Sequence, residues 1–138
     1  MTDRIRIGVL GASGYTGADL VRLALLHPRM EITALTANTH AGKAMAEVFP
    51  HFSFVELPRL TTIEDADWGS VDAVFCGLPH GTTQEITRSV LAQHPKIKFI
   101  DMSADFRLRN PDTYKAWYGN DHVAMDLQAE AVYGLTEH

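Results

Sequence analysis

A glycine-rich turn near the N-terminus places the strongest constraint on the fold. Residues 11–17 read Gly-Ala-Ser-Gly-Tyr-Thr-Gly, after the apolar run 5–10 and at the start of a helix-like segment, 14–27. Glycines at such a strand-to-helix turn permit a tight bend and close packing, and the N–H groups of the helix start favour a pyrophosphate. A plain glycine-rich turn is the alternative. We predict dinucleotide binding by seven consecutive residues: Gly11, Ala12, Ser13, Gly14, Tyr15, Thr16 and Gly17.

Short apolar runs alternate with helix-like segments along the rest of the chain. The periodicity predicts strands at 5–10, 31–37, 71–77 and 96–102, with helices at 14–27, 82–94 and 110–118. We also expect a short helix at 41–49 and short strands at 52–57 and 131–135. Leucines lie nearly all round the 14–27 helix, which predicts that it is mostly buried. This order predicts an α/β fold: a Rossmann-type, doubly wound, mainly parallel sheet with helices on both faces.

Composition limits the possible partners and compartment. The 138 residues fit one domain, and a net charge of −5 with no basic patch argues against nucleic acid as a partner. No apolar run approaches the length of a membrane span, and no secretory signal is visible, so we expect a cytoplasmic protein without a membrane partner. Cys76 is the only cysteine, which excludes an intrachain disulfide, and we expect no metal site. Because Cys76 lies in a predicted buried strand, we interpret it as packing and not as a nucleophile.

The turn after residues 31–37 bears on the choice between NAD and NADP. Sites that prefer NAD usually carry an acidic residue there, on the ribose hydroxyls. This chain has Thr36, Ala37 and Asn38, and no Asp or Glu lies between positions 31 and 47. Small polar groups beside Lys43 suit a 2′-phosphate, so we predict NADP(H) as the cofactor. A merely solvated Lys43 is the alternative.

The turn after residues 71–77 lies where the nicotinamide end of a cofactor would pass. We predict cofactor contacts from Gly77, Leu78, Pro79 and His80. For His80 two interpretations remain open: contact with cofactor or substrate, or a helix-entry residue bonded to backbone. The other histidines are interpreted as surface residues: His27, His40, His51, His94, His122 and His138.

The turn after residues 96–102 contains Ser103 and Arg107. A hydroxyl and a planar guanidinium suit a phosphate or a carboxylate, which makes these two side chains candidate substrate ligands. The alternative is a surface ion pair, either Asp105 with Arg107 or Asp101 with Arg109. The aromatic residues Trp68, Trp117, Tyr114 and Tyr118 are interpreted as core or interface residues.

Four motifs in this order resemble one enzyme family across the whole chain. They are GASGYTGADL at 11–20, LPHG at 78–81, ADFRL at 104–108 and YGL at 133–135. They resemble N-acetyl-gamma-glutamyl-phosphate reductases of arginine biosynthesis and, more distantly, aspartate-semialdehyde dehydrogenases. The resemblance implies reduction of a small-molecule acyl phosphate, N-acetyl-glutamyl 5-phosphate, to the 5-semialdehyde by NADPH. A cysteine thiolate expels phosphate, and hydride then reduces the thioester.

The resemblance also implies what lies outside the chain. The family's nucleophile lies in a Pro-Gly-Cys-Tyr-Pro segment expected soon after Tyr133-Gly134-Leu135, and its catalytic His lies further on. We therefore expect residues 1–138 to be a dinucleotide-binding domain without catalytic residues and inactive alone, with a separate C-terminal catalytic and dimerisation domain. The full-length protein is expected to be a homo-oligomer that holds the substrate phosphate with Ser103 and Arg107. The family often has Ser-Arg where this chain has Ala37-Asn38. The alternatives are a stand-alone NADP-binding module and a fragment of an aspartate-semialdehyde dehydrogenase.

Overall fold

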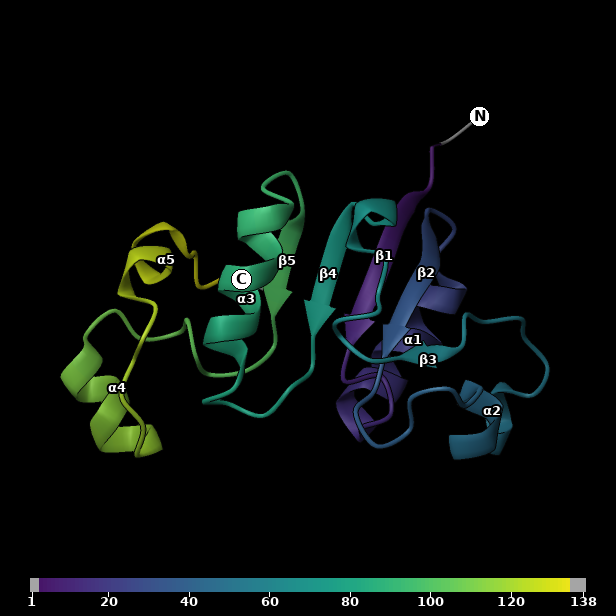
Figure 1. Ribbon diagram of the computed structural model, residues 1–138, viewed down its shortest axis with the longest axis horizontal. Helices are drawn as coiled ribbons and strands as arrows, with labels where there is room; N and C mark the ends of the chain where they lie inside the picture. The colour runs from purple at the N-terminus through teal and green to yellow at the C-terminus, as the bar shows by residue number, and fades with distance from the viewer. Residues whose placement is uncertain (1–2, 135–138) are drawn as a thin grey trace.

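A five-stranded parallel sheet organises the computed structural model, which describes residues 3–134. Its strands are β1 (Ile5–Leu10), β2 (Met30–Thr36), β3 (Leu60–Thr61), β4 (Ala73–Cys76) and β5 (Lys98–Asp101). They lie in the order β3-β2-β1-β4-β5, and each neighbouring pair is parallel (Figure 1). This order confirms the predicted Rossmann-type α/β class, whose topological switch point lies between β1 and β4.

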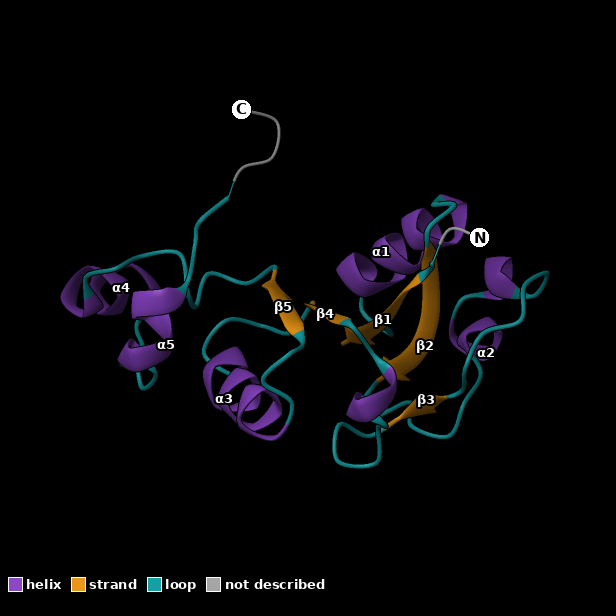
Figure 2. Cartoon of the chain, turned by 90° about the horizontal axis from the view of Figure 1, so that it is seen from above, coloured by secondary structure: helices purple, strands orange, loops and turns teal. Residues whose placement is uncertain are grey.

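Helices cover both faces of the sheet, as the sequence predicted. Figure 2 shows α1 (Tyr15–Leu26) on one face and α3 (Thr83–Gln93) on the other. Successive strand residues point to opposite faces, so Val9 packs in the core under α1 while Leu10 packs in the core under α3. The remaining helices are α2 (Met45–Val48), α4 (Pro111–Tyr118) and α5 (Met125–Glu130), with 3-10 turns at Pro50–Phe52 and Trp68–Ser70.

The predicted helix at 110–118 is confirmed as α4. The residues at its two ends explain where it begins and where it stops. The side chain of Asn110 accepts hydrogen bonds from the N–H groups of Asp112 and Thr113, at 2.9 and 3.1 Å. Pro111 occupies the first helical position, where a missing N–H has no cost, and Gly119 ends the helix with a φ of +76°.

Two predicted short strands are wrong. Over 52–57, Phe52 is buried at the end of a 3-10 turn begun by Pro50, and Phe54 and Val55 are exposed, so the apolar alternation does not mark a strand. The edge strand beside β2 is instead β3, after Pro58. Residues 131–134 form no strand but follow α5, a helix that the sequence analysis missed, and position 135 lies outside the described residues.

The expectation that α1 is mostly buried is also wrong. It packs on the sheet through Ala18, Val21 and Ala24, while Leu23 and Leu26 are 54% and 76% exposed. The accessible surface is 8815 Å², larger than the roughly 7,000 Å² expected of a compact monomer of this mass. Trp117 is likewise exposed and not a core residue, whereas Trp68 is buried.

Candidate functional site

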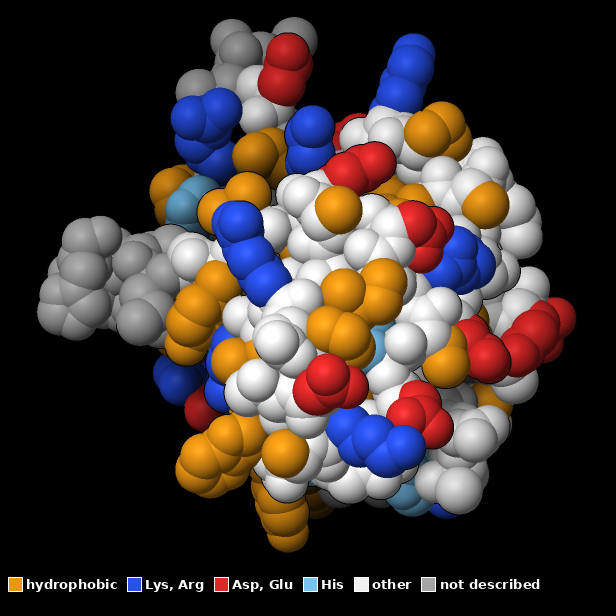
Figure 3. Space-filling view, turned by 90° about the vertical axis from the view of Figure 1, so that its left-hand side faces the viewer, with side chains coloured by type: hydrophobic (Ala, Val, Ile, Leu, Met, Phe, Trp, Pro, Cys, Tyr) orange, Lys and Arg blue, Asp and Glu red, His pale blue; other side chains and the backbone are white. Residues whose placement is uncertain are grey.

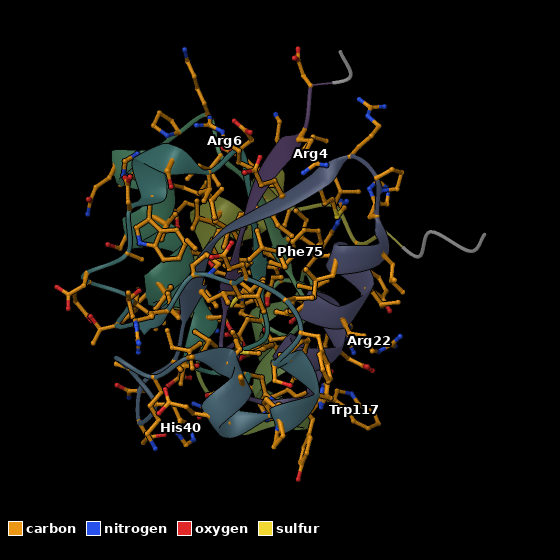
Figure 4. The ribbon with its side chains drawn as sticks, turned by 90° about the vertical axis from the view of Figure 1, so that its right-hand side faces the viewer. Arg4, Arg6, Arg22, His40, Phe75 and Trp117 are labelled. Carbon is orange, nitrogen blue, oxygen red and sulfur yellow. The ribbon has the colours of Figure 1, made fainter. Side chains whose placement is uncertain are left out.

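Four turns gather at the carboxyl ends of the strands. Backbone hydrogen bonds join them: Ala12 N–H donates to the Thr36 carbonyl, Gly77 N–H to the Leu10 carbonyl and Met102 N–H to the Cys76 carbonyl, at 2.9 to 3.0 Å. Figure 4 shows His40 at this end of the molecule, opposite Arg4 and Arg6. The turns that sequence analysis selected therefore share one edge of the sheet.

The glycine turn after β1 is shaped by two of its three glycines. Gly11 has a φ of +74°, a conformation that side chains disfavour. A Cβ at Gly17 would overlap the carbonyl oxygen of Gly11, so this glycine allows α1 to approach the turn. Gly14 is different, because it is exposed with an ordinary φ of −84°, and a Cβ there would come no closer than 3.5 Å to its neighbours.

The N-terminus of α1 fits the phosphates of a dinucleotide. Gly14 is the N-cap residue, so no side-chain hydrogen bond caps this end, and the first turn carries no acidic residue. The N–H groups of Tyr15, Thr16 and Gly17 begin the helix and have no intrahelical acceptor. They add to the positive end of the helix dipole, and Gly14 leaves the space above them open. The geometry is therefore that of an anion site.

The turn after β2 supplies the ribose side of the candidate site. Thr36 and Ala37 are buried there, and Asn38 is exposed. Within the described chain the Thr36 hydroxyl is buried without a hydrogen-bond partner. The first acidic side chain after this turn, Glu47, accepts a hydrogen bond from the Ala44 N–H at 2.7 Å.

A second cation lies beside this turn. The Arg59 guanidinium donates to the Gly42 carbonyl at 2.9 Å, next to the exposed Lys43, and lies 4.0 Å from Glu47. Sequence analysis had singled out Lys43 alone. The fold adds Arg59 because Leu60 pairs with Leu35 of β2, which carries the preceding residue to the same loop.

The turn after β4 lies against the glycine turn. A Cβ at Gly77 would lie 3.4 Å from the Leu10 carbonyl oxygen and 3.6 Å from the Gly17 nitrogen. Pro79 and His80 are exposed, and the His80 ring lies 5.4 Å from that of Tyr118. The side chain that bonds backbone at the helix entry is not His80 but Thr82, whose hydroxyl donates to the Pro79 carbonyl at 2.7 Å.

The turn after β5 brings both predicted substrate ligands to one cleft. Ser103 and Arg107 line a cleft of about 650 Å³ between β5, α3, α5 and residues 131–134. The Ser103 hydroxyl donates to Asp101 at 2.8 Å, and burial raises the pKa of that carboxyl. The exposed Arg107 guanidinium lies 5.6 Å from the Tyr133 ring centre.

The two surface ion pairs considered as an alternative do not form within residues 3–134. Asp105 is fully buried and bonds to backbone N–H groups and a tyrosine instead of Arg107. Asp101 bonds to Ser103 instead of Arg109. Arg107 is therefore not committed to a carboxylate in the described chain.

Cys76 is packed as the sequence analysis interpreted it. It is fully buried in the core under α3, and burial raises the pKa of its thiol to about 12. A thiol in this state is a poor nucleophile near neutral pH.

Sequence analysis missed the buried polar residues behind the site. Asp105, Tyr114, Gln84 and His122 form one hydrogen-bonded group, and His122 is half-buried, not a surface residue. His138 lies outside the described residues. The only sequence signal for this group was the close spacing of Asp101, Ser103 and Asp105 at the end of a strand. Such spacing does not distinguish a buried carboxylate from a solvated one.

A parallel sheet whose first strand leads, through three glycines, to an uncapped helix N-terminus defines a dinucleotide-binding domain. The chain belongs to the semialdehyde dehydrogenase family, because the model of that family's NAD-binding domain matches residues 6–138. It is thus a domain for a nicotinamide cofactor.

Curated relatives agree along nearly the whole chain. It is 55% identical to an N-acetyl-gamma-glutamyl-phosphate reductase of Afipia carboxidovorans over 139 residues, which cover 99% of this chain and 40% of the relative. A protein of the same name from Ruegeria pomeroyi is 57% identical, over 96% of this chain and 38% of the relative. A probable chloroplastic one from Arabidopsis thaliana is 56% identical, over 96% and 32%. The chain thus spans about 40% of the first of these relatives.

Solved structures support the fold. An aspartate semialdehyde dehydrogenase with NADP from Candida albicans has a TM-score of 0.64 and 24% identity, over 79% of this chain and 32% of that one. A Vibrio cholerae aspartate semialdehyde dehydrogenase II has a TM-score of 0.55 and 18% identity, over 76% and 32%. No helix among residues 3–134 is long and apolar enough to cross a membrane.

Proposed function

We propose that this chain is the NADP-binding domain, residues 1–138, of an N-acetyl-gamma-glutamyl-phosphate reductase, with the catalytic and dimerisation domain C-terminal to it. The reaction is reduction of N-acetyl-glutamyl 5-phosphate to N-acetyl-glutamate 5-semialdehyde. The observation that carries the proposal is the uncapped α1 N-terminus over an open Gly14, in a chain 55% identical to proteins of that name.

In this proposal the turns after β1, β2 and β4 hold the cofactor. The N–H groups of residues 15–17 hold the pyrophosphate, since they have no acceptor within the helix, and Gly14 lets the phosphate approach the backbone closely. Thr36, Ala37 and Asn38 lie beside the adenosine ribose, where Lys43 and Arg59 favour a 2′-phosphate and thus NADP(H) over NAD(H). Gly77, Leu78, Pro79 and His80 border the nicotinamide end, which supplies the hydride when the cofactor is bound.

The loop after β5 takes the substrate phosphate. Arg107 is exposed at the cleft and pairs with no described carboxylate, so its planar fork is available for an anion. The hydroxyl of Ser103 already donates to Asp101, so to bind phosphate it would exchange that acceptor for a phosphate oxygen. Ser103 therefore contributes less than Arg107.

The nucleophile of this reaction lies beyond position 138. Cys76 is buried with a strongly raised pKa, and it is the only thiol of the chain. A catalytic thiolate needs an accessible, electropositive position. We therefore expect residues 1–138 to be inactive alone.

The substrate separates this proposal from a fragment of an aspartate-semialdehyde dehydrogenase. The solved dehydrogenases share the fold at 24% identity or less, so they favour neither substrate. The test is phosphate-dependent NADP reduction by the full-length protein, measured with N-acetyl-glutamate 5-semialdehyde and with aspartate semialdehyde. Faster turnover of the second substrate would reject the proposed function. NADP binding without turnover of either would favour a stand-alone cofactor module.

We also propose a cytoplasmic homo-oligomer for the full-length protein. Exposed apolar side chains, including Leu23 and Leu26 on α1, leave surface that further protein would cover. The face that carries α4 and α5 likewise shows hydrophobic side chains between charged ones (Figure 3), and Trp117, Val123 and Val132 are exposed. Light scattering on the full-length protein would test the oligomeric state, and a monomer would contradict it.

A further inference from the structure

A buried carboxylate joins the turn after β4 to the loop after β5. Asp105 is 0% exposed. Its Oδ1 accepts a hydrogen bond from the Gly81 N–H at 2.7 Å, and its Oδ2 accepts one from the Thr83 N–H at 3.1 Å. Both donors belong to the segment that leads from the turn after β4 into α3, whereas Asp105 itself lies in the loop that contains Arg107.

The backbone of Asp105 is held as firmly as its side chain. Its N–H donates to the Ser103 hydroxyl at 3.1 Å, and its carbonyl oxygen lies 2.7 Å from His122 Nε2. The same Ser103 hydroxyl also accepts from the Thr83 hydroxyl at 3.2 Å. The two loops are therefore joined at several points around one residue.

A second layer supports the carboxylate from behind. The Tyr114 hydroxyl donates to Asp105 Oδ1 at 2.7 Å and accepts from Gln84 Nε2 at 3.1 Å. Gln84 Oε1 in turn accepts from the Val123 N–H at 2.6 Å. Burial, followed by the hydrogen bond to Asp105, raises the pKa of Tyr114 to about 12, so this hydroxyl stays a donor at neutral pH.

The stability of the fold does not require a charged side chain at position 105. A buried ionic group is seldom better for stability than well-packed apolar side chains of the same shape. A carboxylate at this position fixes the orientation of the backbone, because its two oxygens accept hydrogen bonds from two backbone N–H groups at once. One of them belongs to Gly81, which has a φ of +89°, a conformation that glycine adopts without strain.

We propose that Asp105 is a positioning residue, which sets the turn at 79–81 against the loop at 103–107. These are the segments that we assign to the nicotinamide end of the cofactor and to the substrate phosphate, so the inference rests on the proposed function. Asp105 touches neither ligand and acts through the two segments. Its carboxylate fixes the relative placement of the two binding groups before either ligand arrives.

The test compares two variants of the full-length protein. In Asp105→Asn an NH2 group replaces one of the two carboxylate oxygens. This group cannot accept a hydrogen bond, so the bond from either the Gly81 N–H or the Thr83 N–H is lost. Tyr114→Phe removes a different hydrogen bond to the same carboxylate. It leaves the bonds from the Gly81 and Thr83 N–H groups intact, which makes it the matched control. We expect Asp105→Asn to raise both the Kd of NADPH and the KM of the acyl phosphate about tenfold. Tyr114→Phe should leave both constants unchanged while lowering the unfolding midpoint.

Asp105→Asn could fail to fold, so a second variant and a measurement on the wild type also test the inference. Asp105→Glu keeps the charge but lengthens the side chain by one methylene. If Asp105 positions the two segments, both the Kd of NADPH and the KM of the acyl phosphate should rise. In the wild type, hydrogen exchange at the Gly81 amide should be slow. Wild-type constants in both Asp105 variants, or rapid exchange at Gly81, would overturn the inference. A wild-type protein that neither binds NADPH nor reduces the substrate would instead reject the proposed function, and slow exchange at Gly81 would then still support the link.

Discussion

The α-carbon of Gly17 packs directly on the carbonyl group of Gly11. Any side chain at Gly17 would collide with that backbone oxygen, so this position is set by the packing of α1 on the sheet. Gly14, between them, is exposed and has a φ that any residue can adopt, and a Cβ there would make only an ordinary contact, 3.5 Å from the Gly11 oxygen. The structure thus separates a glycine required by the fold from one that leaves room for a ligand.

This separation predicts opposite outcomes for two substitutions. Gly14→Val should leave the unfolding midpoint nearly unchanged but weaken NADPH binding at least about hundredfold, because its branches occupy the space above the α1 N–H groups. Gly17→Ala should destabilise the domain by about 3 kcal/mol, because its Cβ meets backbone. Thermal unfolding and calorimetric titration of both variants test this. Near wild-type affinity in Gly14→Val would show that the phosphate site is misassigned.

The preference for NADP is predicted from the cations of the loop after β2. We expect NADP to bind about tenfold more tightly than NAD, because a 2′-phosphate meets Lys43 and Arg59 and no free acidic residue. Arg59→Ala and Lys43→Ala should each reduce the ratio of the two affinities and leave NAD binding unchanged. Calorimetry with both cofactors measures the ratio. Equal or tighter binding of NAD to the wild type would contradict the prediction.

The parts of the fold that sequence analysis predicted are those with strong local signals. The strand at 5–10, the glycine turn and the helix after it follow from side-chain periodicity and glycine spacing, which act over a few residues. The failures need tertiary information. Phe52 and Phe54 alternate as in a strand, yet one is buried and the other exposed because Pro50 starts a turn.

The site was predictable to the same extent. The four turns follow from the rule that ligands bind at the carboxyl ends of parallel strands. Asp105 was considered only as a partner for Arg107, because its true partners, Gly81 and Tyr114, lie 24 and 9 residues away. Arg59 was missed for the same reason, since only the pairing of β3 with β2 brings it to the loop.

Arg107 is predicted to serve the substrate and not the cofactor. Arg107→Lys keeps the charge but loses the planar fork, so the KM of the acyl phosphate should rise about tenfold in the full-length protein. The Kd of NADPH should stay unchanged, because Arg107 lies at the β5 cleft and not at the α1 N-terminus. Steady-state kinetics and a binding titration separate the two effects. Weakened NADPH affinity with an intact KM would reassign Arg107 to the cofactor.

An ion pair at the opposite edge of the sheet predicts a dependence of stability on pH. Arg6 donates to Asp72 through Nε, Nη2 and its backbone N–H, at 3.1, 2.8 and 2.9 Å. These bonds lower the pKa of Asp72 from 3.8 to about 2. Because the folded pKa is the lower one, the stabilisation is present above pH 3.8 and is lost as the pH falls towards 2.

The variant Asp72→Asn tests this pair. Urea unfolding should show the wild type as the more stable protein at about pH 6, with the difference shrinking at about pH 2. Added salt should also shrink the difference, because both side chains are about half exposed. A difference that is independent of pH would show that the Asp72 charge does not stabilise the fold.

The last prediction is that the 138-residue chain has no reductase activity and an unreactive thiol. Cys76 lies between Phe75 and Gly77 at the end of β4, fully buried, and a pKa of about 12 leaves almost no thiolate at neutral pH. Native protein should therefore react slowly with iodoacetamide, whereas unfolding in urea should make the reaction fast. The assay of phosphate-dependent NADP reduction with the semialdehyde should show no turnover. Turnover that disappears in Cys76→Ser would mean that the nucleophile lies within this chain, whereas rapid native alkylation without turnover would contradict only the burial of the thiol.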